Sequence, residues 1–375
     1  MDAIHVLALD GGGMRGLYTA TVLHTLASRF ADARGATGLD LGKGFDLVLG
    51  TSTGGILAAA IATGIPIDEV MALYEKAGPR IFENPIPRCD KSSGFWRKAR
   101  FLWWALTHLR RSGNPNHELK SELKRIFGDW TFGDLHQQRG IGLCISATSA
   151  LKHKPRVFKT RHVSEKDRDD DLTIVEACLA SSAAPIYLPL ASIEADGLSD
   201  QVYADGGLWA NNPVLVGLIE GLAVSKPKQP VVVMSVGTCP PTAGSAPPAD
   251  LDRGIVAWRA GVVPMALAMD AQGQAATYSA TLLAEQLRKF GKPVEILRCE
   301  QSSPSAEQAD DLQLDSASKE ALRLMQALGN EDGQEIYRWY QNRDDDKRGR
   351  LLAQIFERMP EIDPERTPNH KAAGK

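Results

Sequence analysis

The chain contains no apolar run of about 18 residues, so no segment is expected to cross a bilayer as a helix. Its opening residues, MDAIH, lack the basic stretch followed by apolar residues that marks a secretory signal. The 43 Lys and Arg are balanced by 46 Asp and Glu, and a formal net charge of −3 gives no general attraction to a nucleic acid polymer. The 5 cysteines form no CxxC pair and have no metal-like spacing with histidine, so we expect neither a disulfide framework nor a bound metal. An odd, unpaired set of cysteines suits a reducing compartment, which predicts a cytoplasmic globular protein.

Short apolar segments that suit buried strands alternate along the chain with segments of helical periodicity. Alternation of this kind favours an α/β fold in which a mainly parallel central sheet is flanked by helices on both faces. A chain of 375 residues is long enough to bury a core of that size. We expect strands at residues 4–9, 45–49, 141–147, 156–159, 201–204, 231–236 and 294–298, and helices at 17–30, 56–63, 174–182, 214–224 and through much of 251–358.

A run of glycines follows the first expected strand, in the sequence DGGGMRG that ends at Gly16. Gly11, Gly13 and Gly16 satisfy the GxGxxG pattern of dinucleotide-binding folds, but that interpretation requires a carboxylate at the end of the second strand, which runs instead into GTSTGG. Consecutive glycines also expose main-chain N–H groups beside a helix N-terminus, where they stabilise an anion such as the oxyanion of acyl transfer. Arg15 adds positive charge nearby. A tight turn without chemistry is the structural alternative.

The sequence GTSTG, from Gly50 to Gly54, matches the GxSxG pattern and lies between an expected strand and an expected helix. Small residues on both sides of Ser52 allow the strained strand-to-helix turn that projects a nucleophilic hydroxyl. The N-terminus of the following helix points at the same place. We therefore predict that Ser52 is a nucleophile, the alternative being a serine that only forms a turn.

The residue that activates this serine is not expected to be a histidine. A Ser-Asp-His order needs a late histidine, and only one follows residue 162, in the charged C-terminal segment. His136, His153 and His162 lie in polar surroundings and are expected at the surface. Asp205, in the sequence YADGG, ends a short expected strand, and burial would raise its pKa from about 3.9 and make it a stronger base. The alternative is an aspartate that only forms a turn before the two glycines.

In this order, the glycine loop, the GxSxG turn and the DGG aspartate resemble the patatin-like phospholipases. Two further blocks, ASSAAP beginning at Ala180 and NNP beginning at Asn211, fit the same family. The resemblance implies a three-layer patatin-like α/β fold, hydrolysis of lipid acyl esters by a dyad of Ser52 and Asp205, and no cofactor. It also implies an oxyanion hole from Gly11, Gly12, Gly13 and Arg15, with Gly16, Gly50, Gly54, Gly206 and Gly207 shaping the motif turns.

The resemblance extends over residues 4–330, which we expect to form one patatin-like domain with an aromatic and basic insertion at residues 92–111. A helical extension is expected at residues 331–361 and a disordered tail at 362–375. In the insertion, tryptophans flanked by cations suit the interface of an anionic bilayer. This pattern predicts membrane contact by Trp96, Phe101, Trp103 and Trp104, the alternative being a buried helix whose cations reach solvent.

The expected function is phospholipase A-type hydrolysis of membrane phospholipids by a protein that associates peripherally with the membrane when active. Some bacterial enzymes that this chain resembles are antiviral effectors switched on by a cyclic nucleotide, so a cyclic-nucleotide activator is a second expected partner. A homo-oligomer is compatible with that role, and a nucleic acid polymer is not an expected partner. The alternative is a nucleotide-sensing or lipid-binding protein with little intrinsic hydrolysis. A dehydrogenase is disfavoured because the ribose-binding acid is missing.

Overall fold

The computed structural model describes residues 2–87, 94–163, 167–195, 198–240, 251–252, 254, 258–299, 301–309 and 311–362. Residues 92–93 of the expected insertion and 363–375 of the expected tail lie outside these described residues. Within them, no helix is both long enough and apolar enough to span a membrane.

An eight-stranded sheet forms the centre of the molecule, in the order β5-β6-β3-β2-β1-β7-β8 with β4 also paired to β3. Five neighbouring strands, from β8 to β3, run parallel, whereas β4 and β6 run antiparallel to β3, and β5 runs antiparallel to β6. The α/β fold with a mainly parallel sheet is therefore confirmed. Only β5 was not expected, because it is a short, half-exposed edge strand without the apolar run of the buried strands. The strands are β1 Ile4–Leu9, β2 Leu47–Thr51, β3 Gly142–Ser149, β4 Lys154–Lys159, β5 Ala191–Ala195, β6 Leu198–Asp205, β7 Val231–Val236 and β8 Val294–Arg298.

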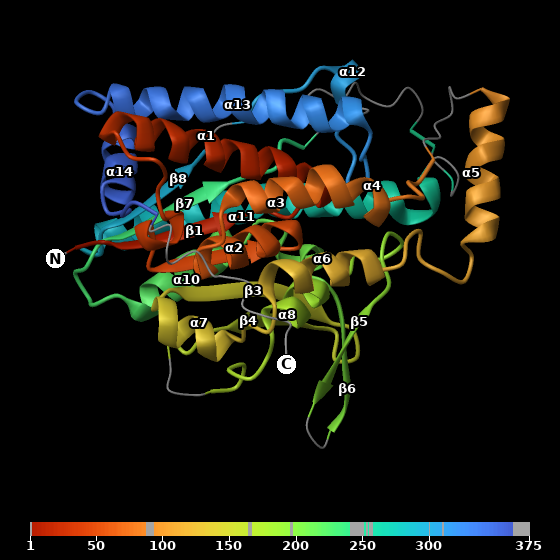
Figure 1. The fold of residues 1–375 in the computed structure, drawn as a ribbon, viewed down its shortest axis with the longest axis horizontal. Helices are drawn as coiled ribbons and strands as arrows, with labels where there is room; N and C mark the ends of the chain where they lie inside the picture. Colours follow the sequence, from red (N-terminus) through yellow and green to blue (C-terminus); the bar gives the residue numbers. More distant parts are fainter. Residues whose placement is uncertain are drawn as a thin grey trace.

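Helices cover both faces of the sheet and one end of it (Figure 1). The α-helices are α1 Gly16–Arg34, α2 Thr53–Thr63, α3 Ile67–Ala72, α4 Gly78–Ile81, α5 Phe95–Thr107, α6 His117–Phe127, α7 Phe132–Arg139, α8 Ile174–Ser181, α9 Gly207–Ala210, α10 Val214–Val224, α11 Val262–Lys289, α12 Ala306–Ala309, α13 Lys319–Gln341 and α14 Lys347–Phe356. The 3₁₀-helical segments are η1 Gly13–Arg15, η2 Leu41–Gly44 and η5 Arg259–Gly261, and η3 Leu73–Ala77 is π-helical.

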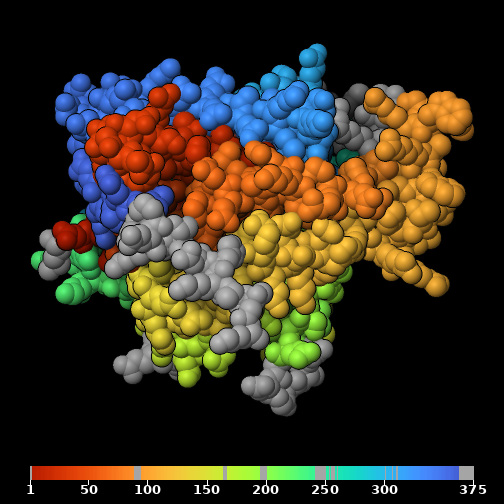
Figure 2. All heavy atoms as spheres, viewed as in Figure 1, coloured from red at the N-terminus to blue at the C-terminus, as the bar shows by residue number. Residues whose placement is uncertain are grey.

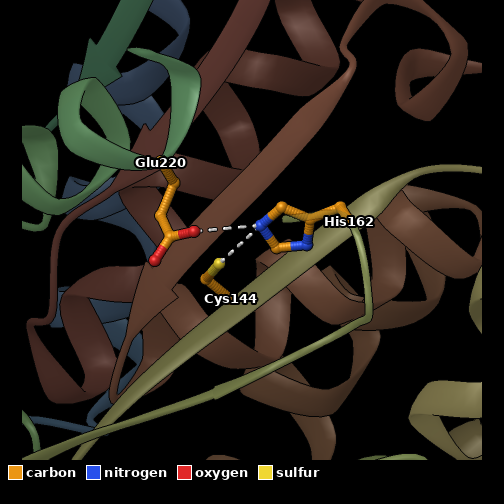
Figure 3. A group of neighbouring side chains, drawn as sticks. All are labelled: Cys144, His162 and Glu220. Carbon is orange, nitrogen blue, oxygen red and sulfur yellow. Dashed lines mark hydrogen bonds and ion pairs between the residues drawn. The ribbon is translucent and has the colours of Figure 1, made fainter. Parts of the chain in front are cut away.

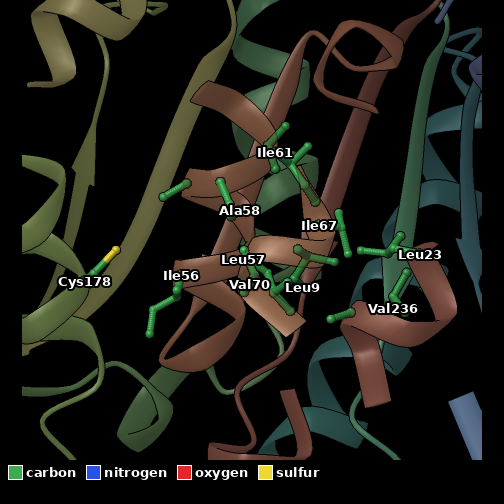
Figure 4. Packing of buried hydrophobic residues seen from close by; sticks show 14 of the residues in the cluster. Leu9, Leu23, Ile56, Leu57, Ala58, Ile61, Ile67, Val70, Cys178 and Val236 are labelled. Atoms are coloured by element: carbon green, nitrogen blue, oxygen red, sulfur yellow. The ribbon is translucent and has the colours of Figure 1, made fainter. Parts of the chain in front are cut away.

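Alternate residues of β1 belong to two separate cores, as the period of a strand requires. Leu7 and Leu9 lie in the larger core with α1 and α2, where Figure 4 shows Leu9 close to Leu57 of α2. Val6 and Ala8 lie in the smaller core with α10 and α11. Two apolar faces on one sheet explain why the strands read as continuous hydrophobic runs in the sequence.

The C-terminal helices complete the larger core. Helix α13 runs along α1 on the outside of the molecule (Figure 1), and its Gly333 lies close to Thr25 of α1. The ring of Phe30 stacks on that of Phe356 of α14, with centroids 4.0 Å apart. Helix α13 continues without a break through residue 330, where the sequence analysis placed the end of the patatin-like domain.

Candidate active site

The register of the sheet brings Ser52 and Asp205 together although 153 positions separate them. Thr51, the last residue of β2, pairs with Ser146 of β3. Asp205, the last residue of β6, pairs with the next residue of β3, Ala147. Strand β4 pairs with the edge of β3 opposite to β2, so β6 pairs with the same edge as β2, just beyond the point where β2 ends. The C-terminal ends of β2 and β6 therefore face each other. Ser52 Oγ donates a hydrogen bond of 2.7 Å to Asp205 Oδ2.

The backbone of Ser52 is strained in the way that a nucleophile turn requires. Its φ of 54° and ψ of −126° are unusual for a residue with a side chain and are typical of a sharp strand-to-helix turn. Gly54 allows this turn, because a Cβ at that position would overlap the carbonyl groups of Leu9 and Asp10. The Ser52 N–H donates to Ser181 Oγ at 2.7 Å, and Ser181 Oγ donates to the Ser146 carbonyl at 2.6 Å. The sequence analysis quoted Ser181 within the ASSAAP block but assigned it no role.

The carboxylate of Asp205 is buried and held on both oxygens. Oδ1 accepts the Gly207 N–H at 2.6 Å, and Oδ2 accepts the Ser52 hydroxyl. Burial raises the pKa of Asp205 to about 6, against the two hydrogen bonds, which lower it. At neutral pH the group is therefore ionised, yet it is a stronger base than a carboxylate in water.

The glycine loop presents two free N–H groups beside this pair. The N–H of Gly11 is already donated to the Asn211 carbonyl at 2.8 Å, so the expectation that Gly11 contributes to an oxyanion hole is wrong in this structure. The N–H groups of Gly12 and Gly13 have no acceptor among the described residues. Gly13 has a φ of +57°, and a Cβ there would overlap the carbonyl of Leu314, so only glycine fits.

A partly buried ion pair fixes the start of this loop. Arg298, at the end of β8, donates to both oxygens of Asp10, at 2.9 and 2.6 Å. Arg15 lies on η1, buried, and burial lowers its pKa, against the attraction of Asp270 and Asp10. Its side chain is not among the described residues that line the cavity at Ser52, so any effect on an oxyanion would be through charge alone.

A narrow apolar cavity of about 50 Å³ opens beside Ser52, Gly12 and Gly13. Such a volume holds at most a few water molecules and is far below the roughly 300–1,000 Å³ of ligand pockets. The wall includes two methionines of α11, which are flexible side chains that can repack. Apolar side chains that line it include Met14, Ile56, Leu73, Leu188, Met265 and Met269.

None of the histidines that the structure describes is hydrogen-bonded to Ser52. His153 is exposed and His136 half-buried. The expectation that His162 lies at the surface is wrong, because its side chain is only 7% exposed and is hydrogen-bonded to Glu220. The hydroxyl of Ser52 is instead hydrogen-bonded to the carboxylate of Asp205.

Helix α5 carries the expected membrane-contact residues in two different environments. It stands apart from the sheet at one end of the molecule and forms a projecting lobe there (Figures 1 and 2). Trp96 and Trp103 are 82% and 71% exposed. Phe101 is only 3% exposed because it packs into the larger core, so it is unavailable to a membrane, which corrects that expectation. Trp104 is half-buried against the same core and stacks on His108.

Known proteins resemble this chain over most of the elements described above. A family model for patatin-like phospholipases matches residues 7–218, which is more than half of the chain. A cGAMP-activated phospholipase of Pseudomonas aeruginosa is 36% identical over 266 residues, which cover 70% of this chain and 71% of that protein. A cUMP-AMP-activated phospholipase of Escherichia coli is 34% identical over 241 residues, with 62% and 63% covered. The crystal structure of VipD from Legionella pneumophila aligns with 94% of this chain and 79% of its own, at 13% identity and a TM-score of 0.36. The chain belongs to the patatin-like phospholipase family, the enzyme family that its motifs predict.

Proposed function

We propose that the protein hydrolyses the acyl esters of membrane phospholipids, with Ser52 as nucleophile and Asp205 as general base. The observation that carries this proposal is the 2.7 Å hydrogen bond from the Ser52 hydroxyl to the Asp205 carboxylate, beside the free N–H groups of Gly12 and Gly13. A nucleophile, a base in contact with it and two oxyanion donors are the parts that acyl transfer requires.

The mechanism follows from these contacts. Asp205 Oδ2 takes the hydroxyl proton as Ser52 Oγ attacks the ester carbonyl carbon. The oxyanion that forms accepts hydrogen bonds from the N–H groups of Gly12 and Gly13. Each such donor contributes about 3 kcal/mol to lowering the barrier in comparable enzymes. Collapse of the intermediate breaks the ester bond, and the leaving alcohol takes the proton from Asp205. Water, deprotonated by the same carboxylate, then attacks the acyl-serine and releases the fatty acid.

Helix α5 is the part of the chain that we propose to contact the membrane. Its exposed aromatic rings and the cations beside them suit the interfacial zone of an anionic bilayer. Contact would be peripheral and from the cytoplasm, where the four described cysteines, which form no disulfide with one another, would stay reduced. The proposed contact residues are Trp96 and Trp103, together with Phe95 and Leu106, which are also exposed.

We further propose that a cyclic nucleotide activates the enzyme and that activation serves antiviral defence. Two of the relatives carry such an activator in their names. The small cavity at Ser52 supports a resting form, because an acyl chain cannot enter until its wall moves. A homo-oligomer is part of the same proposal, since assembly is one way to move that wall.

A groove of about 1140 Å³ near η2 does not suit an anionic activator. Its Arg139 is already paired with Asp40 at 2.8 Å. Further carboxylates line it, namely Asp32, Asp68, Asp129, Asp134 and Glu361. Repulsion of a phosphodiester by these groups argues for a different site for the nucleotide.

Phospholipid hydrolysis by the wild type and by Ser52→Ala, each with and without a panel of cyclic nucleotides, tests the function. We expect low activity alone, a rise with one class of cyclic nucleotide, and no activity for Ser52→Ala under either condition. Ser192→Ala, at an exposed position of β5, is a matched control that should behave as the wild type. Hydrolysis by a well-folded Ser52→Ala variant would refute the assignment of the nucleophile. Equal hydrolysis with and without every nucleotide would refute the proposed activation only.

The membrane contact has a separate test. The double variant Trp96→Ala with Trp103→Ala should bind anionic vesicles more weakly and hydrolyse them more slowly, but should cleave a soluble short-chain ester at the wild-type rate. Phe290→Ala removes an equally exposed aromatic ring outside α5 and should change neither reaction. Equal losses on vesicles and on the soluble ester would show that α5 supports the fold instead of lipid contact.

A further inference from the structure

Three side chains that are distant in the sequence converge on one buried point outside the candidate active site (Figure 3). Cys144 lies on β3, His162 follows β4 and Glu220 lies on α10. Cys144 Sγ is 3.8 Å from His162 Nε2, which is 3.2 Å from Glu220 Oε2. The three donor atoms all lie within 4.8 Å of one another. A thiol, an imidazole and a carboxylate are the three ligand types that Zn²⁺ takes in proteins.

The spacing agrees with the edges of a zinc tetrahedron. With Zn–S near 2.3 Å and Zn–N and Zn–O near 2.1 Å, a tetrahedral ion separates sulfur from nitrogen by about 3.6 Å and nitrogen from oxygen by about 3.4 Å. The observed 3.8 and 3.2 Å differ from these values by about 0.2 Å. Closing the remaining edge needs a movement of at most about an ångström, which a rotation of the Glu220 side chain provides.

The groups around the three side chains orient them toward a shared ion. Thr160 Oγ1 lies 2.8 Å from His162 Nδ1 and is hydrogen-bonded to it. The other ring nitrogen, Nε2, is therefore the one that faces Cys144 and Glu220. Lys159 Nζ holds Glu220 Oε1 at 2.7 Å and leaves Oε2 for a metal. Outer contacts of this kind, one on the second imidazole nitrogen and one on the second carboxylate oxygen, are the usual support of metal ligands.

The three side chains are buried, unlike polar groups that lie close together by chance at a protein surface. The side chains of His162 and Glu220 are 7% and 12% exposed, and Cys144 is 1% exposed. Binding of a divalent cation by the Cys144 thiolate would release the thiol proton to solvent and place opposite charge beside the carboxylate of Glu220.

We propose that Cys144, His162 and Glu220 bind one Zn²⁺ ion, with water as the fourth ligand. The ion would join the middle of β3, the segment after β4 and helix α10, on the face of the sheet that carries α10 and α11. It would therefore stabilise the fold, and the steps of ester hydrolysis do not pass through it. The sequence analysis expected no metal because the cysteines form no CxxC pair and have no metal-like spacing with histidine.

The test starts from chelator-treated full-length protein with Zn²⁺ added back, followed by removal of free metal and elemental analysis. We expect one zinc per chain, a higher thermal midpoint with zinc than without it, and a sulfur-to-metal charge-transfer absorption when Co²⁺ replaces Zn²⁺. His162→Gln and Cys144→Ala should each weaken binding by more than about 100-fold, the upper range for losing an outer contact alone. Cys178→Ala, which removes another buried free thiol, should bind as the wild type.

The Co²⁺ spectrum of the wild type tests thiolate ligation without any substitution, so the proposal does not depend on a variant that folds. No stoichiometric binding by the wild type, or a Co²⁺ complex without sulfur-to-metal absorption, would overturn the proposal. Binding that persists in folded Cys144→Ala and His162→Gln would also overturn it and would leave the cluster as a hydrogen-bonded network.

Discussion

Asp205→Asn should abolish hydrolysis and at the same time stabilise the fold. The pKa of Asp205 is raised from 3.8 to about 6, mainly by burial. A carboxyl whose pKa is higher in the folded state favours folding while it is protonated, and this advantage is lost as the pH rises through about 6. The difference of about two units corresponds to roughly 3 kcal/mol at neutral pH. Asparagine is neutral and has no free-energy cost of ionisation in the buried site, and its amide can still accept a hydrogen bond from the Gly207 N–H and donate one to Ser52 Oγ.

The prediction is best measured as a dependence on pH. The free energy of unfolding of Asp205→Asn, minus that of the wild type, should rise by about 2 kcal/mol between pH 4.5 and pH 8, as read from urea unfolding at each pH. Over the same range, the kcat/KM of the wild type should rise tenfold per pH unit below about 6 and then level off, because only the ionised carboxylate accepts the proton. A stability difference that does not change with pH, or a kcat/KM that is constant down to pH 5, would refute the reasoning.

Two further substitutions test the frame around the nucleophile. Ser181→Ala leaves the Ser52 N–H without its acceptor, so we expect a loss of about 1–3 kcal/mol in stability. We also expect slower covalent labelling of Ser52 by a serine-directed inhibitor. The control Thr63→Ala removes a buried hydroxyl at the far end of α2 and should leave labelling unchanged. Unchanged labelling in folded Ser181→Ala would show that its hydroxyl is not needed to position the serine. Gly13→Ala forces a Cβ against the Leu314 carbonyl at positive φ and should displace the Gly13 N–H. The kcat should therefore fall roughly 100-fold, with the fold retained as judged by circular dichroism. A kcat within about twofold of the wild type would rule out Gly13 as an oxyanion donor.

The strands and the nucleophile turn could be predicted from the sequence because their causes are local. An apolar run such as that of β1 predicts a strand that is buried on both faces, and small residues around Ser52 predict a sharp turn. The role of Asp205 could be proposed from the distribution of histidines and the order of motifs, but its contact with Ser52 could not, because that contact depends on β2 and β6 pairing successively with one edge of β3. No pattern within either segment encodes that register.

Other features could not be predicted because they depend on contacts between distant segments. The α5 sequence shows which residues are aromatic, but the packing that buries Phe101 and exposes Trp103 depends on where the helix lies. The polar sequence around His162 suggests a surface residue, yet the turn after β4 directs its ring toward Glu220 on α10. Gly11 fits its motif, but its N–H is donated to the carbonyl of Asn211 on a different segment.

The candidate active site combines two unfavourable features that the rest of the fold must offset. The positive φ of Ser52 costs on the order of 1–3 kcal/mol, and ionising the buried Asp205 adds roughly 3 more. The same burial that raises this cost also makes the carboxylate a stronger base, since a group with a pKa near neutral pH accepts a proton more readily than one at 3.8. Stability and catalysis are therefore opposed at residue 205. A substitution that lowers the pKa of this carboxyl would stabilise the fold but make the carboxylate a weaker base. Rigid support, such as the hydrogen bond from the Ser52 N–H to Ser181 and the ion pair between Asp10 and Arg298, is what allows the fold to keep both features in place.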